Sequence, residues 1–298
     1  MVKRIALSPS EKMEWEKLVQ LACLKGISSQ SFSIDELVFH GGTSLRFSWG
    51  SPRFSEDLDF MVAKKKSASL GSLVGSAFKN MERELQKLDP NFIVRIKEKS
   101  RRDGQLQTYM IVLEKKDVVG SAQVKLEFWE VSDTFLNSYG TKEKIPRDRF
   151  AETRIFSESA LPVAELRSAY CDKLVALSTR PFLKWRDIFD IWWLRTQNNL
   201  DPLKEKDFLE FFQHNLSAYS LPENMTLKQS LCRYLNWDRN DILRKSEEDL
   251  QKWLSEDLWK KLYPKTVTEM IELVEQDVQS LLDLLTPKNG ISSRSPKP

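Results

Sequence analysis

The chain has 298 residues, of which 41% are hydrophobic and 30% charged, and its formal net charge is +3. This length and composition exclude a disordered protein and allow one large domain or two closely packed ones. The small charge excess does not by itself indicate a nucleic-acid binder, and a chain with only two histidines disfavours a zinc site.

The sequence gives no sign of export or of membrane insertion. No stretch approaches the roughly 18 uninterrupted apolar residues of a membrane span, and the N-terminal segment lacks the apolar core of a signal peptide. Three widely separated cysteines, Cys23, Cys171 and Cys232, are typical of a reducing compartment and argue against a disulfide framework. We therefore expect a cytoplasmic protein with no membrane partner.

The first half of the chain alternates between helix and strand signals. Ser8-Pro9-Ser10 opens a predicted helix that runs to about Lys25, and short strands are predicted at 36–40 and 58–62. The next helix should end near Pro90, because proline cannot continue the helical hydrogen-bond pattern. This helix is predicted at 69–88. Three strands are predicted after it, at 92–99, 106–114 and 122–131.

Strand signals end near Phe156, and the rest of the chain is predicted to be helical. Helices are expected at 162–179, at 185–197 and in several stretches between 204 and 285. The pattern predicts an α+β protein with its cleft between an α/β half and a helical half. The predicted divisions are an α/β domain at 1–156, a helical domain at 157–286 and a disordered tail at 287–298.

A glycine pair, Gly41-Gly42, follows the first short strand and precedes Thr43 and Ser44. A strand, a glycine turn and a helix start together form a geometry that binds phosphate. Glycine lets backbone N–H groups approach the anion, and the helix start adds partial positive charge. Thr43 or Ser44 would cap the helix and donate to the anion. The alternative is a plain turn, which a glycine pair alone favours.

Two aspartates, Asp57 and Asp59, enter the next apolar run with one leucine between them. In a strand they would project from the same face, because alternate side chains point the same way. Carboxylates held side by side repel unless a cation lies between them, and a divalent metal ion meets that need. The alternative is neutralisation at a sheet edge by Arg53, Lys64 or Lys65.

A third carboxylate, Glu127, shares the polar face of the predicted strand 122–131 with Lys125. From a neighbouring strand it would join Asp57 and Asp59 around a hard cation such as Mg²⁺. Three carboxylates opposite a phosphate-binding turn are typical of phosphoryl or nucleotidyl transfer. The alternative for Glu127 is a side chain that only faces solvent.

The helical half places charges among apolar side chains in the segment ELRSAYCDKLVALSTRPFLKWRDIFDIWWL. Lys173 lies in the apolar stripe of the first helix, where a lysine either extends to solvent or meets an anion. The second helix is apolar on nearly every side, so Asp187 and Asp190 should be paired or functional. The structural alternative pairs these acids with Arg180 and Arg186 and joins the two helices.

Two segments carry a resemblance to a known family. The turn GGTS at 41–44, followed by RFSEDLDF at 53–60, looks like the first motif of the DNA polymerase β-like nucleotidyltransferase superfamily in its AbiEii/AbiGii toxin form. That form reads as a GG[ST] turn, a spacer and RxSxDxD. The segment 165–194 is similar to the lysine helix and RDxFD motif of the same family. The resemblance covers about 36–194, and His40 stands where relatives often have another residue.

The resemblance implies a polymerase β-like core with a mixed sheet, followed by a helical domain that completes the cleft. It makes Asp57 and Asp59 ligands of two Mg²⁺ ions, for which Mn²⁺ could substitute. It also makes Lys173 a phosphate contact and Asp187 an acid that completes the site. The residues that it places around the triphosphate are Gly41, Gly42, Thr43, Ser44, Arg53 and Ser55.

The implied reaction is attack by an acceptor hydroxyl on the α-phosphorus of a nucleoside triphosphate. Family members are toxins of type IV toxin–antitoxin or phage-defence systems, so an antitoxin is an expected partner. Some relatives extend the tRNA 3′ end, and basic clusters at 64–66 and 97–102 would suit RNA. Two alternatives stay open: a non-catalytic module that binds a nucleotide or a partner, and a kinase that transfers the γ-phosphoryl group to a protein or small molecule.

Overall fold

The computed structural model describes residues 5–30, 36–102, 105–150 and 154–286. The chain divides into two compact units, Met1–Ala169 and Tyr170–Pro298. The tail predicted to be disordered, 287–298, lies outside the described residues. None of the described helices combines the length and apolar character that a membrane crossing needs.

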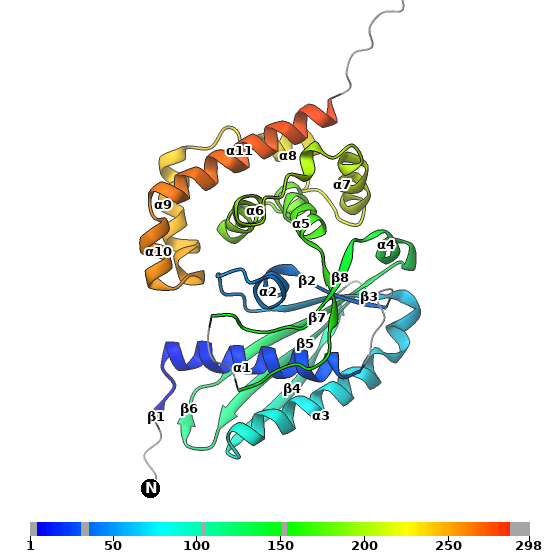
Figure 1. Cartoon of the computed structure of the whole chain (residues 1–298), viewed down its shortest axis with the longest axis vertical. Coiled ribbons are helices and arrows are strands. Elements are labelled where there is room, and N and C mark those ends of the chain that lie inside the picture. The colour runs from blue at the N-terminus through cyan, green and yellow to red at the C-terminus, as the bar shows by residue number, and fades with distance from the viewer. Residues whose placement is uncertain (1–4, 31–35, 103–104, 151–153, 287–298) are drawn as a thin grey trace, which may run out of the picture. The chain divides into compact units, whose positions relative to one another are not determined.

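The first unit is built on a seven-stranded mixed sheet (Figure 1). The mixed sheet predicted for this part of the chain is therefore confirmed. Strand β3 runs parallel to β7 and antiparallel to β2, whereas β2 and β9 are parallel. In spatial order the strands are β4 (Phe92–Arg102), β5 (Leu106–Lys115), β7 (Ala122–Val131), β3 (Leu58–Ala63), β2 (Leu37–His40), β9 (Leu161–Ala164) and β8 (Thr141–Lys144).

Two long helices, α1 (Pro9–Ser28) and α3 (Leu70–Leu88), lie side by side along the sheet (Figure 1). Helix α1 begins where the sequence predicts, with a reciprocal cap between Ser8 and Glu11. The helices approach closely at Gly26, where an added Cβ would overlap the carbonyl oxygen of Ala77. This contact leaves no room for a side chain between α1 and α3.

The centre of the sheet is held by a ladder of three phenylalanines from adjacent strands. The rings of Phe39 and Phe60 are 5.0 Å apart, and those of Phe60 and Phe128 are 5.4 Å apart, with both pairs stacked. All three side chains are buried in the main hydrophobic core. The ladder therefore fixes the register of β2, β3 and β7 through the burial of large apolar rings.

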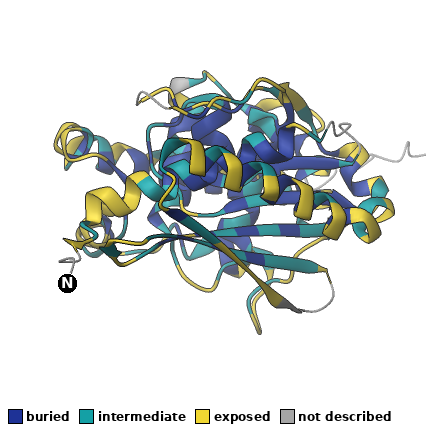
Figure 2. Cartoon of the chain, turned by 90° about the horizontal axis from the view of Figure 1, so that it is seen from below, coloured by how far each residue is buried: buried dark blue, intermediate teal, exposed yellow. Residues whose placement is uncertain are grey.

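One edge of the sheet is the strand β4, whose residues 95–99 are exposed (Figure 2). Lys97 and Lys99, from the second predicted basic cluster, are exposed on β4. Charged side chains on an edge strand discourage pairing with another chain, which gives these lysines a structural role. The remaining described short elements of this unit are β1 (Ile5–Ala6), β6 (Val118–Val119), α2 (Gly41–Ser44), α4 (Asp133–Ser138), the π-helix η1 (Leu45–Trp49) and the 3-10 helix η2 (Lys64–Ser69).

The prediction of a helix from residue 162 is wrong for its first residues. Leu161–Ala164 forms β9, which pairs with β2 and β8, and helix α5 (Leu166–Thr179) begins only after it. Every residue of β9 is buried, so the short apolar run shows no alternation that separates a strand from a helix. The sheet therefore extends past the boundary predicted near Phe156, and the two units divide between Ala169 and Tyr170.

The second unit is helical in its described part, as the sequence predicts. Its last helix, α11 (Lys265–Leu285), contacts several of the others and buries a stripe of residues at helical spacing. Within this core, the buried carboxylate of Asp277 accepts a 2.6 Å hydrogen bond from the hydroxyl of Tyr170. The preceding elements are α6 (Trp185–Gln197), η3 (Pro202–Lys204), α7 (Phe208–Leu216), α8 (Leu227–Cys232), α9 (Arg239–Asp249), η4 (Gln251–Trp253) and α10 (Glu256–Leu262).

The contact between α1 and α3 predicts opposite effects for two glycine-to-alanine substitutions. Gly26→Ala should lower the free energy of unfolding by about 1–3 kcal/mol, because the added methyl group overpacks a closed helix contact. Gly75→Ala, on the exposed side of α3 with nothing near its Cβ position, should raise it by about 0.5–1 kcal/mol. Urea unfolding followed by circular dichroism measures both, and equal effects would contradict the packing argument.

Candidate active site

The sheet face opposite the phenylalanine ladder carries a row of polar side chains. His40 on β2 is paired in register with Asp59 on β3, and Asp59 is paired with Glu127 on β7. Each residue is the immediate neighbour of a ladder phenylalanine, so its side chain points to the other face. The ladder therefore brings together three residues that are far apart in the sequence.

The same face is closed by an apolar cluster farther along the strands. Val38, Met61 and Trp129 occupy the next positions of the same alternation, and Phe135 of α4 packs on them. This cluster covers one side of the polar row. Asp59 is consequently half-buried, although it lies on the polar face.

Asp57 lies just before β3 and is joined to Glu127 through a lysine. The Lys125 ammonium group is 3.2 Å from an Asp57 carboxylate oxygen and 3.0 Å from a Glu127 carboxylate oxygen. Glu127 also accepts a 3.2 Å hydrogen bond from the hydroxyl of Thr108. The sequence placed Lys125 and Glu127 on one face, but it did not reveal that Lys125 bridges the two acids.

The pKa of Asp59 is raised above its usual value, first because burial disfavours the charged carboxylate. The neighbouring carboxylates Asp57 and Glu127 raise this pKa further, while His40 and Lys125 act in the opposite direction. The positive charge around Asp59 therefore does not fully compensate its ionised form. This is the electrostatic setting in which a cation is favoured.

The glycine turn lies directly against this carboxylate. Gly41 has a φ of +77°, which disfavours residues with a side chain, and an added Cβ would sit 2.6 Å from an Asp59 carboxylate oxygen. An added Cβ at Gly42 would collide with the guanidinium group of Arg53 and approach the hydroxyl of Ser55. The turn thus brings the backbone close to both parts of the predicted motif.

Neither Thr43 nor Ser44 caps the short helix α2. The helix starts at Gly41, with His40 as its N-cap and no side-chain capping bond, so the capping prediction is wrong. The Thr43 hydroxyl donates to the backbone carbonyl of Asp57 and is fully buried. The buried Ser44 hydroxyl has no hydrogen-bond partner among the described residues.

Buried side chains hold the loop that precedes Asp57 through hydrogen bonds to its backbone carbonyls. Arg53 is 1% exposed and donates to the carbonyl of Phe54 at 2.8 Å. The side-chain amide of Gln20 donates to the carbonyls of Ser55 and Glu56 at 2.8 and 2.9 Å. These bonds fix the backbone immediately before Asp57.

A second arginine, Arg46, was not singled out from the sequence. It is buried, lies 3.3 Å from the carboxylate of Asp148 and donates to the carbonyl of Pro52 at 3.2 Å. Its guanidinium also lies 4.6 Å from the ring centre of Phe54. The signal available in the sequence is an arginine inside the apolar segment LRFSW, which needs a partner when buried.

The described residues contain no group of three or more histidine, cysteine or acidic side chains arranged to hold a metal ion. The three predicted ligands, Asp57, Asp59 and Glu127, are nevertheless brought to one end of the same sheet face. The ammonium group of Lys125 lies between the carboxylates of Asp57 and Glu127, so these two acids contact a lysine and not each other.

The second unit holds the other predicted site residues in a buried ion network. The Lys173 ammonium group on α5 lies 3.1 Å from Asp187 and 2.8 Å from Asp190, both on α6. Arg180 pairs with the second carboxylate oxygen of Asp187. Two cations and two anions therefore balance, and Asp187 and Asp190 are 1% and 0% exposed.

This network supports the structural reading of these charges in part. Arg180 pairs with Asp187 as that reading expects, but Asp190 pairs with Lys173. Arg186 instead lies over the ring of Trp253. The network joins α5 and α6, and it fixes the position of Lys173 within the unit.

The raised pKa of Asp59 predicts that Asp59→Asn stabilises the fold in metal-free buffer at pH 7. An Asp whose folded-state pKa is raised lowers stability wherever it is ionised. This penalty is absent below the unfolded pKa of about 3.9 and develops as the pH rises towards the folded value. The variant should therefore melt at a higher temperature than the native chain at pH 7, with the difference vanishing near pH 4.

Asp89→Asn provides the opposite sign as a control. Lys115 lowers the pKa of Asp89 through an ion pair at 2.9 Å, so the charged form favours folding above the unfolded pKa. This variant should melt at a lower temperature than the native chain at pH 7, again converging at low pH. Thermal melts across pH would refute the assignment if Asp59→Asn also destabilised the protein.

The buried network predicts a large cost for removing its lysine. Lys173→Met should lower the free energy of unfolding by about 3–5 kcal/mol, because Asp190 would be left as a buried charge without this partner. The same substitution at Lys260, in an exposed pair with Glu256, should leave unfolding unchanged. Chemical denaturation compares the two, and a Lys173 variant as stable as the Lys260 variant would be incompatible with a buried network.

Comparison with known proteins identifies the family. Residues 22–284 match the family described as the nucleotidyl transferase AbiEii toxin of type IV toxin–antitoxin systems. No curated protein matches the chain significantly. The solved structure of JHP933 from Helicobacter pylori is 20% identical, with a TM-score of 0.46 over 94% of this chain and 98% of its own.

Two further solved structures are similar. A Helicobacter pylori protein described as a nucleotidyltransferase is 20% identical, with a TM-score of 0.48 over 94% of this chain and 100% of its own. An antigenic nucleotidyltransferase-like protein from Paracoccidioides brasiliensis is 16% identical, with a TM-score of 0.36 over 71% of this chain and 89% of its own. Because the family match spans most of the sequence and includes both motifs, the chain belongs to the AbiEii family and is a nucleotidyltransferase.

Proposed function

We propose that this nucleotidyltransferase moves a nucleoside monophosphate from a nucleoside triphosphate to an acceptor hydroxyl, with release of pyrophosphate. The observation that carries the proposal is the contact between the glycine turn and the acid row. A Cβ atom added at Gly41 would lie only 2.6 Å from an Asp59 carboxylate oxygen. A triphosphate bound along that backbone would lie beside the carboxylates.

The donor set fits a hard divalent cation, and we assign Asp57 and Asp59 as ligands of Mg²⁺. Carboxylate oxygens are the ligands that Mg²⁺ takes from proteins, and the raised pKa of Asp59 indicates that its charge is undercompensated. Glu127 would join them once the Lys125 ammonium group moves away. Two bound ions would lower the pKa of the attacking hydroxyl and neutralise charge on the departing phosphates.

The surrounding residues position this chemistry. Thr43 holds the backbone of Asp57 through its hydroxyl, so we assign it an orienting role beside its predicted role in binding triphosphate. Arg53 and Ser55 line the other side of the turn at Gly42. In the second unit, Lys173 remains the proposed phosphate contact.

Asp187 is the proposed acid of the second unit, and the ion network fixes its orientation there. The family is described as toxins of type IV toxin–antitoxin systems, which supports a cognate antitoxin as a partner of this chain. We propose an RNA acceptor, with the tRNA 3′ end as the first candidate to test.

The decisive experiment compares two positions of the radioactive label. With Mg²⁺, total tRNA and each nucleoside triphosphate in turn, label from the α-phosphate should enter the RNA and label from the γ-phosphate should not. Asp57→Asn and Asp59→Asn should each reduce transfer by at least a hundredfold, because each removes a proposed metal ligand. Transfer of γ-label would replace this proposal with a kinase.

Asp117→Asn is the matched control, since it removes an aspartate of the same unit that lies outside the acid row. This variant should transfer label as the native chain does. Mg²⁺ should also raise the melting temperature of the native chain but not that of Asp59→Asn. Undiminished transfer by Asp59→Asn would rule out the assigned metal site.

A further inference from the structure

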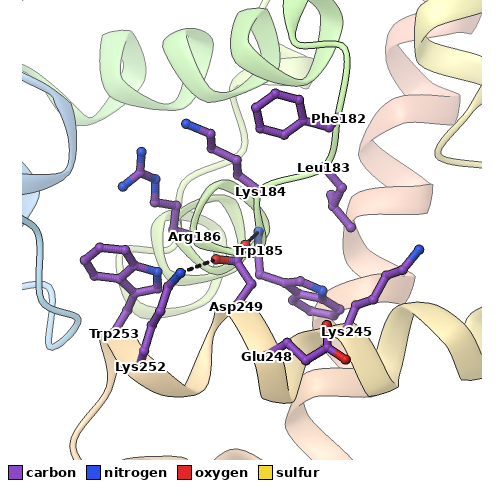
Figure 3. Close-up of a pocket in the computed structure, with 10 residues that line it drawn as sticks. All are labelled: Phe182, Leu183, Lys184, Trp185, Arg186, Lys245, Glu248, Asp249, Lys252 and Trp253. Carbon is purple, nitrogen blue, oxygen red and sulfur yellow. Dashed lines mark hydrogen bonds and ion pairs between the residues drawn. The ribbon is translucent and has the colours of Figure 1, made fainter.

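A pocket of about 510 Å³ is lined entirely by residues of the second unit (Figure 3). One wall comes from residues 182–184 and the start of α6, and the other from the end of α9 and the turn η4. The first wall belongs to the family-like segment 165–194 and includes Arg186 of the RDxFD motif, whereas the second wall lies outside that segment. The acids of the motif, Asp187 and Asp190, do not line the pocket.

The pocket carries an excess of positive charge. Four of its lining residues are basic and two are acidic, an excess of two positive charges among the lining residues. One of the four, Lys245, also lies 2.6 Å from the carboxylate of Asp241, which is outside the lining. Asp249 is already engaged: it accepts a 2.8 Å hydrogen bond from the backbone N–H of Trp185 and lies 3.4 Å from the ammonium group of Lys252. The basic residues are Lys184, Arg186, Lys245 and Lys252.

Aromatic rings are interleaved with these cations (Figure 3). Arg186 and Lys252 lie 5.4 and 5.2 Å from the ring centre of Trp253, and Lys184 lies 5.6 Å from that of Phe182. Phe182 is 59% exposed, which leaves a large apolar ring in water. A planar ligand stacked on this ring would remove that apolar surface from water.

Two indole donors of the pocket are unsatisfied. The ring N–H groups of Trp185 and Trp253 are buried, and neither has a hydrogen-bond partner among the described residues. Trp185 is 1% exposed and Trp253 is 8% exposed. Buried donors normally have partners, so both groups favour a ligand that brings hydrogen-bond acceptors.

We propose that this pocket binds single-stranded nucleic acid. Phosphates would contact the four basic side chains, a base would stack on Phe182, and ligand oxygens would accept from the indoles. Basic groups interleaved with aromatic rings are the usual construction of single-strand sites. A duplex hides its base faces, and the acidic residues of a peptide have no flat ring, so neither a duplex nor a polyacidic peptide uses all of these features.

The identification of this strand as the acceptor of nucleotide transfer rests on the proposed function, but the binding itself does not. Binding can therefore be measured without turnover. The probes are fluorescein-labelled single strands of RNA and of DNA with the same mixed sequence, titrated with the full chain in EDTA and without nucleoside triphosphate. Fluorescence anisotropy gives the Kd of each probe, and comparing the two Kd values shows whether the pocket prefers RNA or DNA.

Phe182→Ala should weaken binding about five-fold to a hundred-fold through loss of base stacking. Lys245→Gln combined with Lys252→Gln should also weaken it, and should reduce the slope of log Kd against log salt by about 1.4, or ~0.7 for each lost phosphate contact. These side chains are exposed, and circular dichroism verifies that the variants fold.

The matched controls are Phe156→Ala, another exposed phenylalanine, and Lys206→Gln combined with Lys228→Gln, which lie outside the pocket. Both should bind as the native chain does, and so should Asp57→Asn. Pocket variants that bind like the native chain, or controls that weaken binding equally, would overturn the proposal. So would tighter binding of duplex or of polyglutamate. If the native chain binds the single strand through this pocket but transfers no nucleotide to RNA, only the proposed function is refuted.

Discussion

The stacked rings of Phe39, Phe60 and Phe128 are the constraint on which the acid row depends. They set the register of β2, β3 and β7, and strand alternation then places the next residue of each strand on the opposite face. A slip of one residue on β3 would turn Asp59 into the core and Phe60 out of it. The burial of three large rings makes that slip costly, so apolar packing on one face determines the chemistry of the other.

Asp59 and the buried carboxylates of the second unit differ in how far neighbouring cations compensate them. In the second unit, Lys173 and Arg180 balance two almost fully buried aspartates, which is how a buried ionic cluster avoids a large desolvation penalty. In the first unit, the pKa of Asp59 is raised, first by burial and then by the neighbouring carboxylates of Asp57 and Glu127. An undercompensated carboxylate weakens the fold, and such a cost is common where a site must bind a cation. The contrast supports the proposal that the first unit binds a cation.

Much of the fold and part of the candidate site follow from local pattern. Capping residues, proline and strand alternation predict α1, the end of α3 and the strands around the acid pair, because these signals act over a few residues. The same reasoning misassigns β9, whose four buried residues show no alternation. It also assigns Thr43 to helix capping, whereas the Thr43 hydroxyl holds the Asp57 carbonyl.

The sequence by itself determined which groups are present and which face each would occupy: two aspartates one residue apart, a glycine turn before them and a glutamate on an alternating strand. Only the tertiary structure decided their partners. Lys125 bridges Asp57 and Glu127, and Arg46 meets Asp148 across a separation of 102 residues. The reason is physical: alternation and capping depend on neighbouring residues, whereas an ion pair depends on strand order, register and burial, which the whole chain sets together.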